Sequence, residues 1–599
     1  MPEVFATTDA RRWRARSVVP CLKQRGSGAF GEVEVDGLLF AHTKLNTLEL
    51  DEPGRQPATS RDGRIKLLLN GEIYNLRHVG RQLGLDGLCS GAQLLAEILA
   101  RDPQQLGLLR GMYAFVAWDS EAQQLLAARD PFGIKSLYVL RHSSGELSLA
   151  SQIAPLLRDP EARHVDHVGL STYLAFGHTG PGLTSFTAVS KLAPGCLHRW
   201  RRCSVGYERS AMMPTPSPAV TGDLESALHD SVRAHLMADK EVDTFLGSGA
   251  ESTLLTYLAA QERRQVRTFT VSLPEGPEGN ETAIASHNAR LIGSDHTVVP
   301  AATADLARAA RLFLREHGEP FADAAMLPLT HLSLAVGGTS RGVLCGDGAR
   351  ELFGGYARYR VSNQLPRSRL LPLPRRQRAA NWWGLRRGGG FGKLAIEAVL
   401  AGGGFRSHSA LLDGDLPLLG ALDPIARRDV HALTSSGWRT SAGGELGRAR
   451  RYDSDVWLPN VSLQKTERST MAGILKRRLP FLDHEVTTAA AREPLVADAS
   501  MAPLRRLLTQ WLPGVQLPDR ENGVAVDVRT LVLRHFVRQV EHQLVDPLAA
   551  LSQWRGRPDD GQARRRAERS PSFAFRLAML DEWQTLFGND LIWEHVCRA

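Results

Sequence analysis

The feature that most constrains the fold is a regular alternation of short apolar runs and helical segments after residue 222. The runs at Val242–Gly249, Val266–Leu273 and Arg341–Gly348 have the length of buried strands, and helix-forming segments lie between them. This alternation is typical of a mostly parallel sheet with helices on both faces. Because ligands bind beyond the carboxyl ends of the strands in such sheets, we expect the functional site at that edge.

Two of these strands end in glycine turns, Leu246–Ser252 and Cys345–Ala349. A strand, a Gly/Ser turn and a helix start together form a phosphate cradle, because backbone N–H groups point outward and the helix dipole favours negative charge. One such turn is common in proteins. Two on neighbouring strands, with Glu251, Asp347 and Glu351 beside them, favour a nucleotide site that also holds Mg²⁺ through carboxylate oxygens.

The first 200 residues have a different pattern, in which strands and turns predominate. Ile65–Asn70 is a buried-strand run that we expect to end at a turn at Asn70-Gly71, and Met112–Asp119 and Leu137–Leu140 are further strands. Gly91–Asp102 has helical spacing. We therefore predict an α+β unit of two packed sheets, separated from the rest by the Pro/Ser/Thr-rich stretch Met212–Gly222.

Composition excludes several classes of protein. The 599 residues are 43% hydrophobic and 23% charged, no apolar run has the ~18–20 residues of a membrane helix, and the N-terminus lacks a secretory signal. The six cysteines are scattered without metal or disulfide spacing, which predicts a cytoplasmic protein with no membrane association. The net charge of +9 does not indicate nucleic acid. The basic segment Arg367–Arg387 is interpreted as a solvated face, with docking of a peptide as the alternative.

Longer segments resemble a known family. Leu67–Asn75, Ala128–Val139 and Lys191–Gly195 are similar to the glutaminase half of asparagine synthetase, and Gly346–Tyr359 and Ser462–His484 are similar to its synthetase half. The segments occur in the family's order and span about residues 25–525.

This resemblance implies the fold class and the domain boundaries. It implies an Ntn-type glutaminase-like α+β sandwich at 1–210, followed by an ATP-pyrophosphatase (PP-loop) parallel-sheet α/β synthetase domain at 220–545. A helical extension is expected at 546–599.

The resemblance also implies a reaction in which a carboxylate is adenylated by ATP, pyrophosphate leaves, and an amine displaces AMP. It implies catalytic roles for Asp347, which would orient or deprotonate the amine, and Lys465, which would stabilise transition-state charge. It implies Mg²⁺ ligands at Glu251 and Glu351, and a carboxylate site shaped by Glu319 and Asp323. The residues expected around ATP are Leu246, Gly247, Ser248, Gly249, Ser252, Val271, Cys345 and Gly346.

The N-terminal domain departs from the family where glutamine would be hydrolysed. The catalytic cysteine is expected after the initiator Met, where this chain has Pro2, and Cys21 is internal without a free α-amine. Asn70, Gly71 and Glu72 match the glutamine-binding turn, but Gly91 stands where an acid is expected. We predict that the pocket is a remnant without glutaminase activity.

The synthetase domain departs from the family at three charged positions. Glu251 stands where the first loop of the family has an aspartate, which keeps a carboxylate ligand for Mg²⁺ that is one methylene longer. Arg350 stands where the second loop of the family has an acid; it cannot bind a metal, although it can neutralise departing pyrophosphate. Glu521 stands where a lysine is expected.

Three hypotheses follow. The first is an ATP-dependent ligase that closes a macrolactam within a peptide, as lasso-peptide cyclases and β-lactam synthetases close amides within one substrate; its partners would be a precursor peptide and its processing protease. Tethering of the amine would replace the high concentration of ammonia otherwise needed. The second is an asparagine synthetase that uses ammonia or glutamine. The third is a catalytically impaired scaffold. The sequence leaves the oligomeric state open.

Overall fold

The computed structural model of the chain describes residues 3–14, 30–43, 56–85, 87–88, 90–204, 206–216, 222–237, 242–273, 279–369, 444–494, 501–518, 571–588 and 591–592, with single positions 18, 22, 405, 408, 409, 412 and 438. Pro2, Cys21, Glu521 and the basic segment after Arg369 lie outside these residues.

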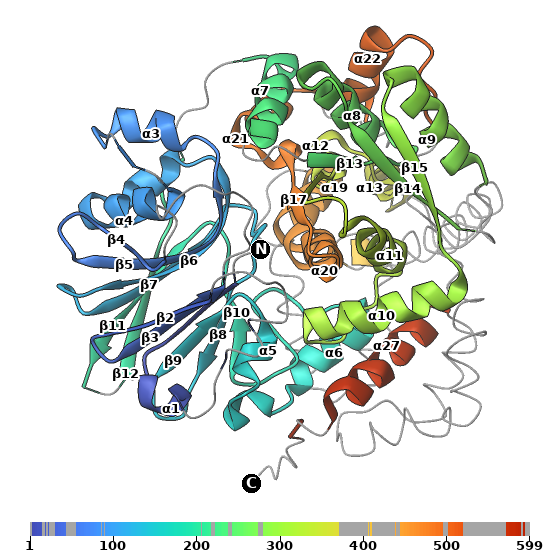
Figure 1. Cartoon of the computed structure of the whole chain (residues 1–599). Helices are drawn as coiled ribbons and strands as arrows, with labels where there is room; N and C mark the ends of the chain where they lie inside the picture. The colour runs from blue at the N-terminus through green and yellow to red at the C-terminus, as the bar shows by residue number, and fades with distance from the viewer. Residues whose placement is uncertain are drawn as a thin grey trace.

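The N-terminal part is a sandwich of two antiparallel sheets (Figure 1). The first sheet has the order β10-β8-β9-β1-β3-β2, with strands Val189–Lys191, Tyr138–Arg141, Leu147–Ala150, Glu3–Thr7, Leu38–Thr43 and Phe30–Val35. The second has the order β12-β11-β7-β6-β5-β4, with strands Gly206–Met212, Leu197–Cys203, Gln124–Arg129, Gly111–Asp119, Ile65–Ile73 and Ala58–Thr59. Phe40 and Leu149 of the first sheet pack in one buried cluster with Val116 and Trp118 of the second. The predicted α+β sandwich is confirmed.

The predicted turn at Asn70-Gly71 is wrong, because β5 continues to Ile73 and Gly71 pairs with Tyr113 of β6. Gly71 has a φ of +148°, and a Cβ atom there would lie 2.1 Å from the carbonyl oxygen of Met112. Here glycine permits a close approach of two strands and not a reversal of the chain.

Helices cover the outer sides of this sandwich. Helix α4 (Gly91–Arg101) begins after Ser90, whose Oγ accepts from the N–H of Gln93, and its apolar face packs on β5 and β6. Further helices in the described part of this domain are α1 (Ala10–Arg14), α3 (Leu76–Gln82), α5 (Ile153–Leu156) and α6 (His167–Phe176).

The second part contains a parallel sheet in the order β15-β14-β13-β16-β17, which confirms the predicted parallel α/β architecture (Figure 1). Its strands are Asp295–Pro300, Arg267–Ser272, Val242–Phe245, Gly342–Leu344 and Lys476–Arg478. From β13 the chain continues to β14 and β15 on one side of the sheet, and from β16 it continues to β17 on the other side. The strand order therefore reverses between β13 and β16. This junction is where parallel sheets open a crevice at their carboxyl edge.

Helices lie on both faces of the parallel sheet. Leu228 of α7 and Leu254 of α8 pack in one buried cluster, whereas Leu332 of α11 and Leu463 of α20 pack in another against β16. The helices are α7 (Leu224–Met237), α8 (Ala250–Glu262), α9 (Gly279–Ile292), α10 (Thr303–His317), α11 (Met326–Val336), α12 (Ala349–Phe353), α13 (Ala357–Arg369), α19 (Glu445–Tyr452), α20 (Leu463–Ala472), α21 (His484–Ala490) and α22 (Ala502–Trp511). A π-helical segment, Asp453–Ser462, leads into α20. Within the described ranges, none of the helices combines the length and the apolar character that crossing a membrane requires.

Helix α27 (Pro571–Phe587) contacts both domains (Figure 1). Glu582 pairs with Arg311 of α10 at 2.7 Å, and Nε1 of Trp583 donates to the carbonyl of Gly318 at 3.1 Å. On the other side, the hydroxyl of Tyr173 in α6 donates to the carbonyl of Arg576 at 2.6 Å. The helix that we expected in a C-terminal extension therefore joins the sandwich to the synthetase domain.

Candidate active site

The central strand β13 ends in the loop Leu246–Gly249, and α8 follows at once. The loop is closed by the first turn of that helix. The N–H of Gly247 donates to Oγ of Ser252 at 3.0 Å, and Oγ1 of Thr253 donates to the carbonyl of Gly249 at 2.9 Å. Ser and Thr in a first helical turn commonly satisfy local backbone groups in this way, and here they hold the loop at the carboxyl end of β13.

The neighbouring strand β16 ends in a second glycine loop, Cys345–Gly348. Gly348 has a φ of +90°, and a Cβ atom there would lie 2.3 Å from Cδ2 of Leu482. A Cβ atom on Gly346 would lie 2.6 Å from Cγ of Glu251, which belongs to the first turn of α8. Glycine at both positions lets the two loops approach each other where the strand order reverses.

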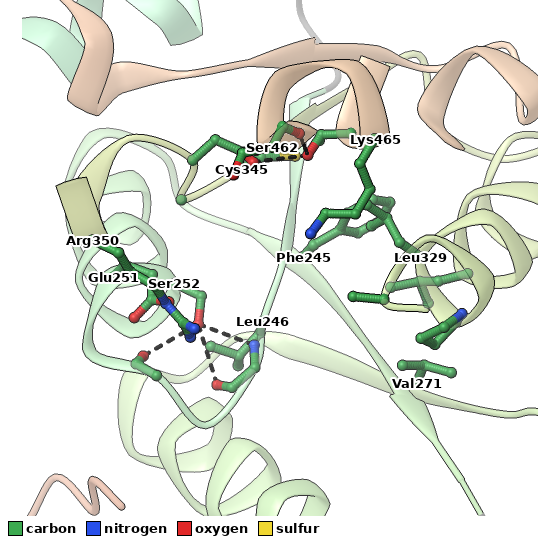
Figure 2. Close-up of a pocket in the computed structure, with 18 of the residues that line it drawn as sticks. Phe245, Leu246, Glu251, Ser252, Val271, Leu329, Cys345, Arg350, Ser462 and Lys465 are labelled. Atoms are coloured by element: carbon green, nitrogen blue, oxygen red, sulfur yellow. Dashed lines mark hydrogen bonds and ion pairs between the residues drawn. The ribbon is translucent and has the colours of Figure 1, made fainter. Parts of the chain in front are cut away.

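A cavity of about 420 Å³ lies at this edge of the sheet (Figure 2). Its size is in the range of small-molecule and cofactor sites. All twelve residues predicted in the second domain for nucleotide binding, metal binding and catalysis line it. They are Leu246, Gly247, Ser248, Gly249, Glu251, Ser252, Val271, Cys345, Gly346, Asp347, Glu351 and Lys465.

Several other lining residues were missed from the sequence. Leu329 comes from α11, Tyr356 follows α12, and Trp457 comes from the π-helical segment. Apolar and aromatic residues at helical spacing look the same in a sequence whether they face a core or a cavity, so no local signal distinguishes them. Thr466 was also missed, although it adjoins Lys465.

Helix α20 places two functional groups at the cavity. Nζ of Lys465 lies 2.8 Å from Oδ2 of Asp323, and Oγ1 of Thr466 donates to Oδ1 of Asp347 at 2.8 Å. Burial raises the pKa of Asp347, although Arg477 and the bond from Thr466 oppose that rise. A carboxylate with a raised pKa is a better proton acceptor than an ordinary aspartate.

Arg350 forms an ion pair with Glu251 at the other side of the cavity, opposite Lys465 (Figure 2). Nε and Nη2 of Arg350 lie 3.1 and 3.0 Å from the same oxygen, Oε1 of Glu251. The second oxygen, Oε2, is buried and has no hydrogen-bond partner among the described residues. Thus the acid of the first loop already faces a cation that the chain itself supplies.

Glu351 is buried deep in the cavity wall, with 2% of its surface exposed. The hydroxyl of Tyr356 donates to its Oε1 at 2.7 Å. Burial raises the pKa of Glu351 to about 7, and the bond from Tyr356 only partly opposes this. The side chain is therefore protonated in a large fraction of molecules at neutral pH.

Comparison with known proteins identifies the chain. The asparagine synthase family model matches residues 223–584, and a glutamine amidotransferase domain model matches residues 3–209. The chain belongs to the asparagine synthase family. It is 30% identical over 553 residues to putative glutamine-hydrolysing asparagine synthetases of Mycobacterium bovis and Mycobacterium tuberculosis, covering 84% of this chain and 81% of the relative. It is 25% identical to asparagine synthetase 1 of Bacillus subtilis over 78% of this chain and 76% of that protein, and 25% identical to amidase chyE of Penicillium rubens over 77% and 75%. Members of this family are ATP-dependent carbon–nitrogen ligases.

In this asparagine synthase family member, both carboxylates that we predicted as magnesium ligands already have a partner within the chain. Glu251 is paired with Arg350, and Glu351 is bonded to Tyr356 and readily protonated. Among the described residues, no group of three His, Cys, Asp or Glu side chains with ligand atoms within 4.8 Å of one another lies at this cavity.

One group among the described residues does meet that distance, in the N-terminal domain: His142, Asp159 and Glu161. Arg12 already pairs with its two acids, at 2.5 Å for Asp159 and 2.7 Å for Glu161. This cluster is therefore an internal ion-pair network.

The segment Asn70–Glu72, which resembles the family's glutamine-binding turn, does not line the cavity and lies at the interface of the two domains. Glu72 forms ion pairs with Lys476 and with Arg478 of β17, the latter at 3.1 Å. Burial disfavours the charge of Glu72, but the two cations outweigh it and lower its pKa. Asn70 is buried. Gly91 is the first residue of α4, and a Cβ atom there would lie 3.0 Å from Cγ1 of Ile73. Glu72, which matches the family's glutamine-binding turn, is therefore engaged by cations of the synthetase domain.

Burial also bears on Glu319 and Cys345. Glu319 is fully buried and pairs with Lys191 of the N-terminal domain at 2.8 Å, so only Asp323 of the two predicted acids lines the cavity. Cys345 is buried, and burial raises the pKa of its thiol far above the ordinary value. Burial thus disfavours the thiolate, which is the nucleophilic form of a cysteine.

Proposed function

We propose that this family member adenylates a substrate carboxylate with ATP and joins it to an amine of the same substrate, closing a macrolactam in a peptide as lasso-peptide cyclases do. One observation carries the proposal: a cation-bearing cavity with a buried carboxylate lies at the glycine loops, while the glutamine turn of the same chain is engaged in an interface.

The reaction has two steps. A carboxylate oxygen attacks the α-phosphorus of ATP, forming an acyl-adenylate while pyrophosphate leaves. The amine nitrogen then attacks the acyl carbon, the bond to AMP breaks, and the proton lost by nitrogen passes to a base. Lys465 is suited to stabilise charge on the phosphates, and Asp347, oriented by Thr466, is suited to accept the proton.

The proposal takes the amine from the substrate itself and not from ammonia that the N-terminal domain would release from glutamine. Position 2 is a proline without a thiol, and Glu72 neutralises Lys476 and Arg478 across the interface. An amine tethered to the carboxylate needs no such supply, because tethering raises its effective concentration. Tyr356 and Trp457 add an aromatic wall to the cavity, which suits a peptide side chain better than a small acid alone.

The second candidate is an asparagine synthetase that uses ammonia, and the names of the mycobacterial and Bacillus relatives favour it. The third, a scaffold without catalysis, is supported by Arg350 at a position where an acid is expected.

The deciding experiment measures pyrophosphate release from ATP by the purified protein with each of four additions: aspartate, aspartate plus ammonia, aspartate plus glutamine, and a peptide encoded beside its gene. We expect release that requires the peptide, with loss of one water from the peptide in the mass spectrum. Release with aspartate and ammonia would establish the asparagine synthetase instead.

A variant tests the site itself. Lys465→Met should lower the rate of pyrophosphate release by about a hundredfold or more, because a charge that faces the reacting phosphates is lost. Lys66→Met, on the exposed side of β5, is the matched control and should leave the rate unchanged. Equal rates in both variants would remove Lys465 from the proposed mechanism.

A further inference from the structure

We infer that Arg350 binds the phosphates of a nucleotide and supplies the positive charge that a divalent cation, held by a second carboxylate, would otherwise bring. This chain therefore binds a triphosphate without requiring a divalent cation. The inference rests on the proposed function, because it takes ATP as the ligand of the cavity.

The charges that line the cavity create the need for such a residue. Among the described residues that line it, five are acids and two are cations. The acids are Glu251, Glu281, Asp323, Asp347 and Glu351, and the cations are Arg350 and Lys465. The acids outnumber the cations even where Glu351 is protonated, so each cation has a large effect on the affinity for a triphosphate.

The two cations serve different sides of the cavity. Lys465 is paired with Asp323 and lies opposite the first glycine loop, whereas Arg350 lies over that loop beside Glu251 (Figure 2). The Gly/Ser loops at Leu246–Gly249 and Cys345–Gly348 are where phosphate oxygens are expected, and the guanidinium of Arg350 is the cation beside them.

The geometry of the pair suits exchange with a phosphate. Arg350 retains 24% side-chain exposure, and its Nε and Nη2 both lie on one oxygen of Glu251. A planar guanidinium binds phosphate through two parallel N–H donors, and it is more weakly hydrated than an ammonium group. Its charge cancels that of Glu251, so the carboxylate nearest the loops does not repel the nucleotide.

The test compares the affinities of ATP, inorganic pyrophosphate and adenosine by titration calorimetry, each in excess EDTA and in Mg²⁺. We expect the wild-type protein to bind ATP in EDTA within about tenfold of its affinity in Mg²⁺. Arg350→Ala should weaken ATP and pyrophosphate by tenfold or more and leave adenosine within about twofold. The affinities of Arg350→Lys for ATP and pyrophosphate should lie between those of the wild-type protein and of Arg350→Ala, because a lysine keeps the charge but not the paired donors.

Glu251→Gln separates the inference from a metal-ligand role. If Arg350 replaces the metal, this variant should bind ATP in EDTA at least as well as the wild-type protein, because the arginine loses its competing carboxylate. If Glu251 holds a required Mg²⁺, the variant should lose ATP binding in Mg²⁺, and the inference is wrong.

A matched control is Arg64→Ala, which removes a similarly exposed arginine that pairs with Asp119 in the N-terminal domain at 2.7 Å. It should leave all three affinities unchanged. ATP binding by the wild-type protein only in Mg²⁺, or normal pyrophosphate binding by Arg350→Ala, would overturn the inference alone. A wild-type protein that binds neither adenosine nor ATP with Mg²⁺ would instead overturn the proposed function.

Discussion

Helix α20 carries Lys465 and Thr466 toward the cavity and Glu467 toward the N-terminal domain, so replacing Glu467 tests how the two domains are coupled. Glu467 is 2% exposed. Its Oε2 accepts from the hydroxyl of Ser136 at 2.5 Å, and its Oε1 lies 3.7 Å from Nζ of Lys135, which is also buried. Glu467→Gln keeps the shape of the side chain and removes its charge.

The cost follows from the pKa values of the pair. Burial disfavours the charge of Glu467, but Lys135, Arg468 and Arg477 outweigh it and lower its pKa from 4.5 to about 2, which corresponds to about 3 kcal/mol at neutral pH. Burial lowers the pKa of Lys135 to about 8 even with Glu467 present, so this lysine gains less from the pair than it loses by burial. Removing one partner of a buried pair costs about 3–5 kcal/mol for the same reason. We expect Glu467→Gln to destabilise the protein by about 3 kcal/mol.

The assay is urea unfolding at pH 7.5, followed by fluorescence and by circular dichroism, with Glu262→Gln as the control. Glu262 pairs with the exposed Arg233 at 3.0 Å, so its loss should cost under about 1 kcal/mol. Because the folded pKa of Glu467 lies below its unfolded value, its contribution is present above pH 4.5 and is lost as the pH falls toward 2. A cost at pH 7.5 no larger than that of the control, or one that does not shrink in acid, would refute this reasoning.

Three further changes test the site. Thr466→Val removes the donor to Asp347, so the pKa of Asp347 should rise further and the acidic limb of the pH–rate profile should move to higher pH. An unchanged limb would count against the role of Asp347. The folded pKa of Glu351 is about 7, so its contribution to the stability of the wild-type protein is present below pH 4.5 and is lost as the pH rises through 7. Between pH 5 and pH 8.5, Glu351→Gln should therefore gain about 2–3 kcal/mol of stability relative to the wild-type protein. Urea unfolding of both proteins at the two pH values checks this. Gly348→Ala should cost at least about 2 kcal/mol in urea unfolding, because φ is +90° and the new Cβ meets Leu482; a normal stability would show that the loop can relax.

Much of the catalytic domain is determined by local sequence. The glycine loops after β13 and β16 follow directly from the apolar runs and the Gly/Ser turns, because a strand, a turn and a helix start depend on neighbouring residues. Lys465 was predicted from the resemblance to the family and not from a local pattern, and it lines the cavity with both loops. By contrast, β17 was not predicted, since its sequence, Lys476–Arg478, is entirely basic and lacks a strand pattern.

The tertiary structure decided how the charges are paired, because pairing depends on side chains that are distant in the sequence. The sequence showed that Arg350 and Glu251 replace family residues, but only packing of α12 beside α8 makes them an ion pair. In the same way, Glu72 belongs to a glutamine motif in the sequence, whereas docking of the sandwich against β17 surrounds it with two cations. A motif specifies which groups are present locally; their charge state and availability are set by the partners that folding brings to them.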